Sequence, residues 1–354
     1  MPTDTLAKWM KSALACLAIY AICIGGSPRP GLAADYHELD GNTIRVIIST
    51  SAGETTDTLA RSFFKSLEAE VPNVTIRIQN IPGGVKALKE LGGASESGVT
   101  LVVGNRTAIY TQLIKPDESL DLTKVDWVAS LAQANRMLAI RKNMPETTAQ
   151  ALLKMEGQVK FGALKFDPSA FEPLLVNALT EFRFRVVVGM SEGERHTMIL
   201  NSELDGRSGS RFELQPLFDN GEMVPFLKIK KDGYPKELDS VPSLSDLVTS
   251  DSDSVVLSTM EKLDRLGGLL IASSKITDGA LLAALRRAVA AAAKSPEFLK
   301  QAETLGSAVK FTDGVTLARD LEPIVNPASG VAAKMRAAIE CGQKKSETGQ
   351  ATCK

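Results

Sequence analysis

The chain has 354 residues, more than one hydrophobic core comfortably serves, so its length predicts two lobes or domains. Apolar residues make up 44% and charged residues 23%, which excludes disordered, collagen-like and multi-pass membrane proteins. Lys and Arg total 41 against 42 for Asp and Glu, so no overall basic field indicates a nucleic-acid partner. Only two histidines and four cysteines are present, which leaves little material for a His-rich metal site or a His-based catalytic triad.

Residues 1–33 have the pattern of a secretory signal peptide. Lys8 and Lys11 precede an apolar run over 13–24, which is too short to span a bilayer. Gly31 and Ala33 supply the small residues at positions −3 and −1 of a cleavage site. We therefore expect a cleaved leader and a periplasmic protein; the alternative is a retained membrane anchor.

Two cysteines lie outside that leader. Cys341 and Cys353 stand in a polar segment over 341–354, which we interpret as a C-terminal tail. In an oxidising compartment a disulfide between them is expected, and it would fasten a fraying chain end. The alternative is a pair of free thiols.

Strand and helix patterns alternate along the chain. A β-branched run over 44–50 predicts a buried strand, and apolar residues at helical spacing over 57–70 predict the helix that follows. This succession predicts an α/β fold, in which ligands bind where strands end and helices begin. The turns over 49–57 and 104–108 are therefore the first candidates for a site. Further strands are expected over 74–78, 100–104, 159–163, 184–188 and 266–272, and further helices over 171–179 and 280–294.

One short motif matches the nucleophile elbow of serine hydrolases. Gly189-Met-Ser191-Glu-Gly193 has the form G-x-S-x-G and follows a predicted strand. The chemistry needs a histidine base well downstream, but His196 lies five residues on in the same predicted helix and cannot turn back to Ser191. We interpret the match as chance and predict no catalytic residue, cofactor or metal site. A serine hydrolase using Ser191 stays a distant alternative.

Six short segments carry landmarks that occur together in one known family. The segment Gly53-Glu-Thr-Thr-Asp57-Thr-Leu-Ala60-Arg61 matches a first-strand turn of the form Gly-Gly-x-x-Asp-x-x-Ala-Arg. The other five, in chain order, are 78–84, 97–101, 126–131, 186–205 and 241–246. Over roughly Arg45 to Phe311 this order resembles the substrate-binding proteins of tripartite tricarboxylate transporters, also called the Bug family.

The resemblance implies the two-lobe fold of type 2 periplasmic binding proteins, each lobe a mostly parallel sheet flanked by helices. It implies two crossing strands, near Met137–Arg141 and Leu266–Ala272. Lobe 1 would comprise 35–140 with 266–340, and lobe 2 would comprise 141–265. The implied function is a monomeric periplasmic receptor that captures a small organic solute, usually a carboxylic acid, between the lobes and delivers it to a membrane transporter.

The candidate ligand-binding residues follow from the turns and from the resemblance. Backbone N–H groups at a helix N-terminus can hold a carboxylate, and small hydroxyl residues add hydrogen bonds. The resemblance gives Asp57 the role of fixing the first turn or a bridging water; the alternative is a helix cap. The candidates are Ser49, Ser51, Ala52, Gly53, Glu54, Thr55, Thr56, Asp57, Asn105, Thr107, Lys165, Ser169, Ser191 and Asp205.

Two residues depart from the family pattern and bear on the ligand. Glu54 replaces a glycine, and its carboxylate would repel an anionic ligand unless it points outward or lies on its own helix N-terminus. Lys165 stands in a turn that no longer matches; it either restores positive charge or is a solvated loop lysine. A less acidic or cationic solute is therefore an alternative, as is an exported sensor or accessory protein with a changed ligand.

Overall fold

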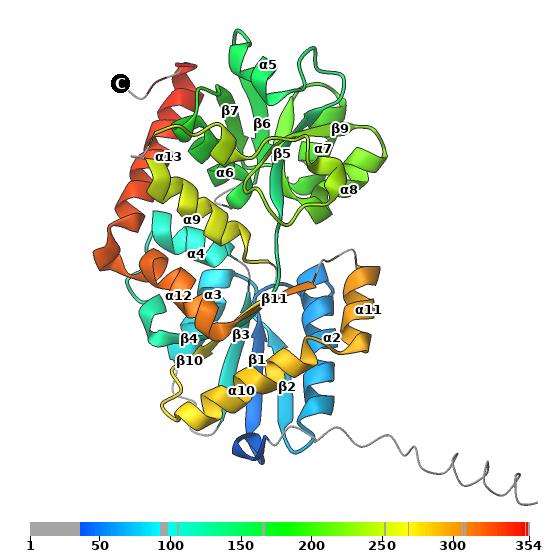
Figure 1. Cartoon of the computed structure of the whole chain (residues 1–354), viewed down its shortest axis with the longest axis vertical. Helices are drawn as coiled ribbons and strands as arrows, with labels where there is room; N and C mark the ends of the chain where they lie inside the picture. Colours follow the sequence, from blue (N-terminus) through cyan, green and yellow to red (C-terminus); the bar gives the residue numbers. More distant parts are fainter. Residues whose placement is uncertain are drawn as a thin grey trace, which may run out of the picture. The chain divides into compact units, whose positions relative to one another are not determined.

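The computed structural model describes residues 36–92, 98–104, 106–164, 167–250, 253–267, 269–305, 307, 309–350 and 352. The predicted signal peptide, Asn105, Lys165 and Cys353 lie outside these residues. Glu38–Lys354 form one compact unit that contains two β-sheets with flanking helices (Figure 1). Among the described residues, no helix is long and apolar enough to cross a membrane.

The first sheet has the strand order β11-β4-β10-β3-β1-β2. Its centre is built from aliphatic runs: β1 pairs in parallel with β2 and β3, and the inward side chains of β1 and β3 are buried. Strand β10 is antiparallel to both β3 and β4. The bounds are β1 (Thr43–Ile48), β2 (Thr75–Asn80), β3 (Val99–Gly104), β4 (Val125–Ala132), β10 (Leu270–Ser274) and β11 (Val309–Asp313).

Helices of the first sheet follow from the apolar spacing of their sequences. In α2 (Thr55–Glu70), Leu59, Phe63 and Leu67 recur on one face and are buried, and α10 and α11 pack against this helix. The rings of Phe63 and Phe298 meet edge to face at 5.3 Å. The other helices are η1 (His37–Leu39), α3 (Gly84–Lys89), η2 (Glu90–Gly92), α4 (Thr107–Ile114), η3 (Leu122–Lys124), α10 (Gly279–Ala292), α11 (Pro296–Thr304), α12 (Gly314–Val325) and η7 (Pro327–Ser329).

The second sheet has the order β7-β6-β8-β5-β9 and packs around a cluster of phenylalanines that includes Phe161, Phe184 and Phe226. Its strands are β5 (Arg136–Arg141), β6 (Val159–Ala163), β7 (Phe184–Val188), β8 (Gly206–Ser210) and β9 (Met223–Lys228). Its helices are α5 (Ala149–Lys154), α6 (Pro168–Leu179), α7 (Glu192–Leu200), α8 (Arg211–Asp219), η4 (Lys236–Leu238), η5 (Leu244–Asp246) and α9 (Ser254–Asp264). We call each sheet with its helices a lobe.

The predicted two-lobe α/β class is confirmed, but both sheets are mixed rather than mostly parallel. The antiparallel pairs arise at the strands that carry the chain from one sheet to the other. The chain passes at 133–135, between β4 and β5, and again at 265–269, between α9 and β10. We call these the first and second crossing segments. Met137–Arg141, predicted as a crossing, lies within β5 of the second sheet.

The C-terminal segment is a helix rather than the expected polar tail. Helix α13 (Val331–Thr348) packs along α6 and also contacts α9 and α4, as its red ribbon in Figure 1 shows. Lys345 is buried, and its ammonium donates to the carbonyls of Asn177 (2.6 Å) and Thr180 (2.7 Å). The polar residues of this segment therefore cap the end of α6. Cys341 lies on α13; the disulfide stays a prediction, because Cys353 is outside the described residues.

Candidate functional site

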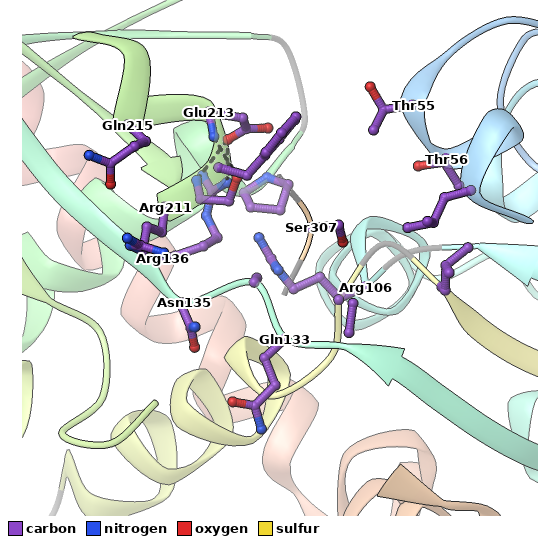
Figure 2. Close-up of a pocket in the computed structure, with 18 of the residues that line it drawn as sticks. Thr55, Thr56, Arg106, Gln133, Asn135, Arg136, Arg211, Glu213, Gln215 and Ser307 are labelled. Carbon is purple, nitrogen blue, oxygen red and sulfur yellow. Dashed lines mark hydrogen bonds and ion pairs between the residues drawn. The ribbon is translucent and has the colours of Figure 1, made fainter. Parts of the chain in front are cut away.

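A cavity of about 720 Å³ lies between the two lobes and is lined by residues of both. We call it the interlobe cavity. Lobe 1 contributes the N-termini of α2 and α4, lobe 2 contributes the starts of α6 and α8, and the first crossing segment completes the wall. Figure 2 shows the polar lining residues Thr55, Thr56, Arg106, Gln133, Asn135, Arg136, Arg211, Glu213, Gln215 and Ser307.

The loop between β1 and α2 is held by Asp57. Its buried carboxylate accepts hydrogen bonds from the Gly53 amide (2.9 Å), the Asn80 side chain (2.8 Å) and Arg61 Nε (2.9 Å). Burial alone would raise the pKa of Asp57, but these bonds and the Arg61 charge lower it, so the group stays ionised. Gly53 has a φ of +84°, a conformation that glycine adopts without strain. Asp57 therefore positions the loop that presents Thr55 and Thr56.

Glu54 does not line the interlobe cavity. Its carboxylate accepts a hydrogen bond from the Ser51 amide (2.9 Å), and Glu54 is itself the N-cap residue of α2. The negative charge thus lies on the helix N-terminus, where it is stabilised. Glu54 therefore meets one of the conditions under which its carboxylate is compatible with an anionic ligand: it lies on its own helix N-terminus.

Arg106 is the main cavity residue that the sequence analysis missed. It is the N-cap residue of α4, two residues after the end of β3, and is only 7% exposed. Its Nη1 donates to the Leu266 carbonyl (3.1 Å) in the second crossing segment, and its Nη2 lies 3.9 Å from Glu172 Oε1 on α6. Its Nε is buried with no hydrogen-bond partner among the described residues. One donor of a guanidinium that contacts both lobes is therefore unused.

Arg136, by contrast, is fully engaged with protein groups. Its Nε lies 2.6 Å from Glu172 Oε2, its Nη1 lies 3.2 Å from Glu213 Oε2, and its Nη2 donates to Ser208 Oγ (3.1 Å). Burial alone would lower the pKa of Arg136, but the charges of Glu172 and Glu213 raise it above its ordinary value. Arg136 is thus a permanently charged part of the wall, and each of its guanidinium nitrogens already has a protein partner.

Arg211, the first residue of α8, offers a second unused donor. Its Nε is buried with no hydrogen-bond partner among the residues described here, and its Nη2 lies 3.7 Å from Glu237. Two acidic lining residues serve as helix caps: Asp167 accepts from the Ser169 amide (3.0 Å), and Glu213 from the Ser210 amide (2.7 Å). The cavity therefore combines two guanidinium groups that have spare donors with carboxylates that are already bonded.

Three predicted site residues line the cavity: Thr55, Thr56 and Thr107. The predicted residues of the first loop that do not line it are Ser49, Ser51, Ala52, Gly53, Glu54 and Asp57. Ser169 lies one residue beyond the lining Pro168, and its hydroxyl bonds to Asp167 (2.5 Å). Asn105 and Lys165 lie outside the described residues.

Ser191 and Asp205 have other contacts in lobe 2. Ser191 is the N-cap of α7, in a capping box with Glu194, and its hydroxyl lies 2.8 Å from the Glu194 carboxylate. The imidazole Nε2 of His196 lies 3.7 Å from Glu222 Oε2. Asp205 accepts from the Lys160 amide (2.8 Å) and pairs with Arg141 (3.2 Å). Neither Ser191 nor Asp205 lines the interlobe cavity.

Of the cavity residues that were not predicted, only Arg106 had a signal in the sequence. Arg106 stands between Asn105 and Thr107, both selected from the turn over 104–108, so the turn was right and its cation was overlooked. Arg211 and Gln133 had no motif around them. Among the described residues, no group of three or more His, Cys, Asp or Glu is placed to hold a metal ion.

Comparisons with known proteins agree on the fold. No protein-family model matches the sequence, and no curated protein matches it significantly. A TctC solute-binding protein from Polaromonas is similar in structure, with a TM-score of 0.63 and 16% identity, covering 84% of this chain and 98% of that one. A protein from R. palustris with adipate has a TM-score of 0.60 at 16% identity, covering 84% and 97% of the two chains.

A third similar structure is MatC from Rhodopseudomonas palustris with bound malate. Its TM-score is 0.53 at 18% identity, and the match covers 86% of this chain and 99% of that one. All three matches span nearly the whole length of the other protein, so the likeness extends over both lobes. The resemblance inferred from the motifs is confirmed at the level of the fold: this chain has the two-lobe fold of TctC-type solute-binding proteins.

Proposed function

We propose that this protein is an exported periplasmic receptor that captures a small organic anion, a carboxylic acid, in the interlobe cavity and delivers it to a membrane transporter. In this proposal the chain is a divergent member of the Bug family, acts as a monomer and catalyses no reaction. The solute is the only non-protein partner.

The observation that carries the proposal is the state of Arg106. A buried guanidinium with an unpaired donor costs free energy, and an anion bound in the cavity would supply the missing acceptor. Arg106 lines the cavity and contacts groups of both lobes and of the second crossing segment. Hydrogen bonds between a guanidinium and a carboxylate are among the strongest available for recognition.

The rest of the wall is consistent with a small acid. A volume of about 720 Å³ lies within the range of small-molecule sites. Thr107 is the first residue of α4, so the cavity lies beside a helix N-terminus whose free N–H groups favour anions. Arg211 adds a second cation from lobe 2.

Two similar structures contain adipate and malate, which are dicarboxylic acids. They support a carboxylate as the first class of solute to test. A hydrolase finds no support in the geometry, because the Ser191 hydroxyl bonds to Glu194 and lies outside the interlobe cavity.

A thermal-shift screen of the leaderless protein tests the proposal. The probes are malate, adipate and other di- and tricarboxylates, with amino acids and amines as the competing classes. A solute at a hundred times its Kd stabilises the fold by about 2.7 kcal/mol, which raises the Tm by several degrees. A shift with amines and none with acids would overturn the choice of an anion. No shift with any class would overturn the receptor.

A further inference from the structure

A single buried carboxylate joins the two crossing segments. Asp264, the last residue of α9, is 2% exposed and directly precedes the second crossing segment. Its Oδ1 accepts a hydrogen bond from the backbone amide of Arg136 (2.8 Å), and its carbonyl accepts from the amide of Ala134 (3.2 Å). Any relative motion of the lobes about these segments therefore moves groups bonded to Asp264.

The second oxygen of this carboxylate has no hydrogen-bond donor. Asp264 Oδ2 is buried and has no hydrogen-bond partner among the described residues; the ammonium of Lys230 lies 3.8 Å away. That ammonium instead donates to Asn135 Oδ1 (2.8 Å) and to the Asp232 carbonyl (2.5 Å). Asn135 has a φ of +47°, so Lys230 stabilises the left-handed turn of the first crossing segment. Oδ2 is therefore a buried position where a proton can bind.

Titratable groups from several elements interact with Asp264. The groups that interact with it are Arg106 and Tyr110 from α4, Arg136 from β5, Glu172 from α6, and Lys230 and Tyr234 from the segment after β9. Burial raises the pKa of Asp264 to about 6; Arg106 and Lys230 oppose this rise, and Glu172 adds to it. Burial likewise raises the pKa of both tyrosines, which stay neutral.

Charges of both signs meet around Asp264 before a solute enters. Arg106, Arg136 and Lys230 face the buried Glu172 and Asp264 and the half-exposed Glu213. An anion bound at Arg106 adds one negative charge to this set and shares the cation that helps to keep Asp264 ionised. Since charges interact strongly in a buried site, the carboxylate that loses least by becoming neutral takes up a proton. Asp264 is that carboxylate, because its oxygen Oδ2 lacks a donor.

We propose that the interlobe cavity binds its anionic solute together with one proton, which Asp264 holds on Oδ2, so that Asp264 determines the charge specificity of the site. This inference rests on the proposed function. The step balances as protein, anion and proton giving one complex, with no bond to carbon made or broken. During this step Oδ1 continues to accept from the Arg136 amide. Affinity for an anion then rises as the pH falls, by up to about tenfold per pH unit, whereas affinity for a neutral solute does not.

Isothermal titration calorimetry tests the coupling directly. The leaderless protein is titrated with adipate, and in parallel with malate, at about pH 7, where free carboxyl groups are ionised. Each titration is repeated in two buffers of different ionisation enthalpy. We expect the binding heat to depend on the buffer, with an uptake of about 0.5 to 0.9 proton per site.

Two variants locate the proton. Asp264→Asn should bind the acid with no proton uptake, since Asn can still accept from the Arg136 amide. Asp232→Asn is the matched control: Asp232 forms an exposed ion pair with Arg265 (2.9 Å) beside the same crossing segment. Its pKa is lowered, despite partial burial, by Arg265 and Lys230, so it stays ionised, and this variant should keep the wild-type uptake.

The outcomes distinguish a failure of the proton coupling from a failure of the proposed receptor function. Binding heat that is independent of the buffer in the wild type overturns the proton coupling and leaves the receptor intact. Uptake that persists in Asp264→Asn also overturns it, because another group then holds the proton. Absence of binding heat with both acids, when no other acid shifts the Tm, overturns the proposed function and the coupling together. If Asp264→Asn fails to fold, the wild-type measurement in two buffers still decides whether binding takes up a proton.

Discussion

The backbone amide of Arg136 donates to the carboxylate of Asp264 across 2.8 Å. The first residue of β5 is thus bonded to the last residue of α9, and the first and second crossing segments are tied together at one buried point. The same Arg136 forms ion pairs with Glu172 and Glu213 in the wall of the interlobe cavity. The crossing segments and the cavity therefore share one network of charges. We expect a change of charge in the cavity to alter the interactions at the crossing segments, and the reverse.

Arg106→Lys should weaken carboxylate binding by about 10- to 100-fold, because lysine keeps the charge but loses the Nε donor. Affinity is measured by calorimetry with whichever acid shifts the Tm. The matched control is Arg286→Lys: Arg286 also donates to a backbone carbonyl, that of Trp127 (2.7 Å), but lies outside the cavity. An equal loss of carboxylate affinity in both variants would contradict the role of Arg106.

Asp57→Asn should lower the free energy of unfolding by about 1–3 kcal/mol at pH 7, since the ionised carboxylate accepts three hydrogen bonds in the first loop. The lowered pKa of Asp57 fixes the sign of the pH dependence. Its contribution is present above the unfolded value of about 3.9 and is lost as the pH falls through the folded value. Urea unfolding between pH 3 and 7 checks this, with the exposed Asp320→Asn as the control. If the difference in the free energy of unfolding between wild type and Asp57→Asn does not change with pH, an ionised Asp57 is excluded.

Asp264 should give the opposite pH dependence without any solute. Its folded pKa of about 6 lies above the unfolded value, so its contribution to stability is present at low pH and is lost as the pH rises through 6. The asparagine of Asp264→Asn cannot ionise, so the free energy of unfolding of this variant should not fall in this pH range. Relative to wild type, it should increase on the order of 2–3 kcal/mol between pH 4 and pH 7.5. Chemical denaturation at several pH values measures the gain. A constant difference would show that Asp264 is ionised throughout.

Gly342→Ala should destabilise the protein by about 2–3 kcal/mol. A Cβ at this position of α13 would lie 1.9 Å from the Leu174 carbonyl oxygen, so the helix must move away from α6. Gly279→Ala in α10 is the control, because its Cβ would meet nothing within 4 Å and alanine favours a helix. Equal Tm values for the two variants would show that the contact between α13 and α6 is loose.

The predicted disulfide has its own test. Peptide mapping of the exported protein without reduction should recover Cys341 and Cys353 in one linked peptide. Loop closure of this size contributes at most about 3 kcal/mol, and α13 is already packed on α6, so reduction should lower the Tm by only a few degrees. Recovery of two free thiols would refute the pairing.

Local patterns predicted the elements that contribute one side of the site. The β-branched run of β1, the turn after it and the amphipathic spacing of α2 are all encoded within residues 43–70, so Thr55 and Thr56 could be assigned to a strand end. The rule that ligands bind at such ends then selected Thr107 in the same way. Arg106 was overlooked because a turn contains several polar residues and local pattern does not say which one points inward.

The far wall and the crossing segments could not be predicted in this way. Arg136 and Arg211 meet in one wall of the cavity because β5 pairs with β8, which ends where α8 begins. Side-chain periodicity carries no information about pairing between residues so far apart in the chain. The C-terminal helix was misread as a tail because Lys345 is polar in sequence and finds its partners only on α6.

The sequence by itself determined the α/β class, marked the strand-end loop that contains Asp57 and left little material for a histidine-based triad. These conclusions depend on composition, periodicity and short motifs. Only the tertiary structure decided which cations face the cavity and that Asp264 is buried between the crossing segments. The reason is physical: the pKa of a carboxyl group depends on its burial and on charges from several elements, which only the folded chain brings together.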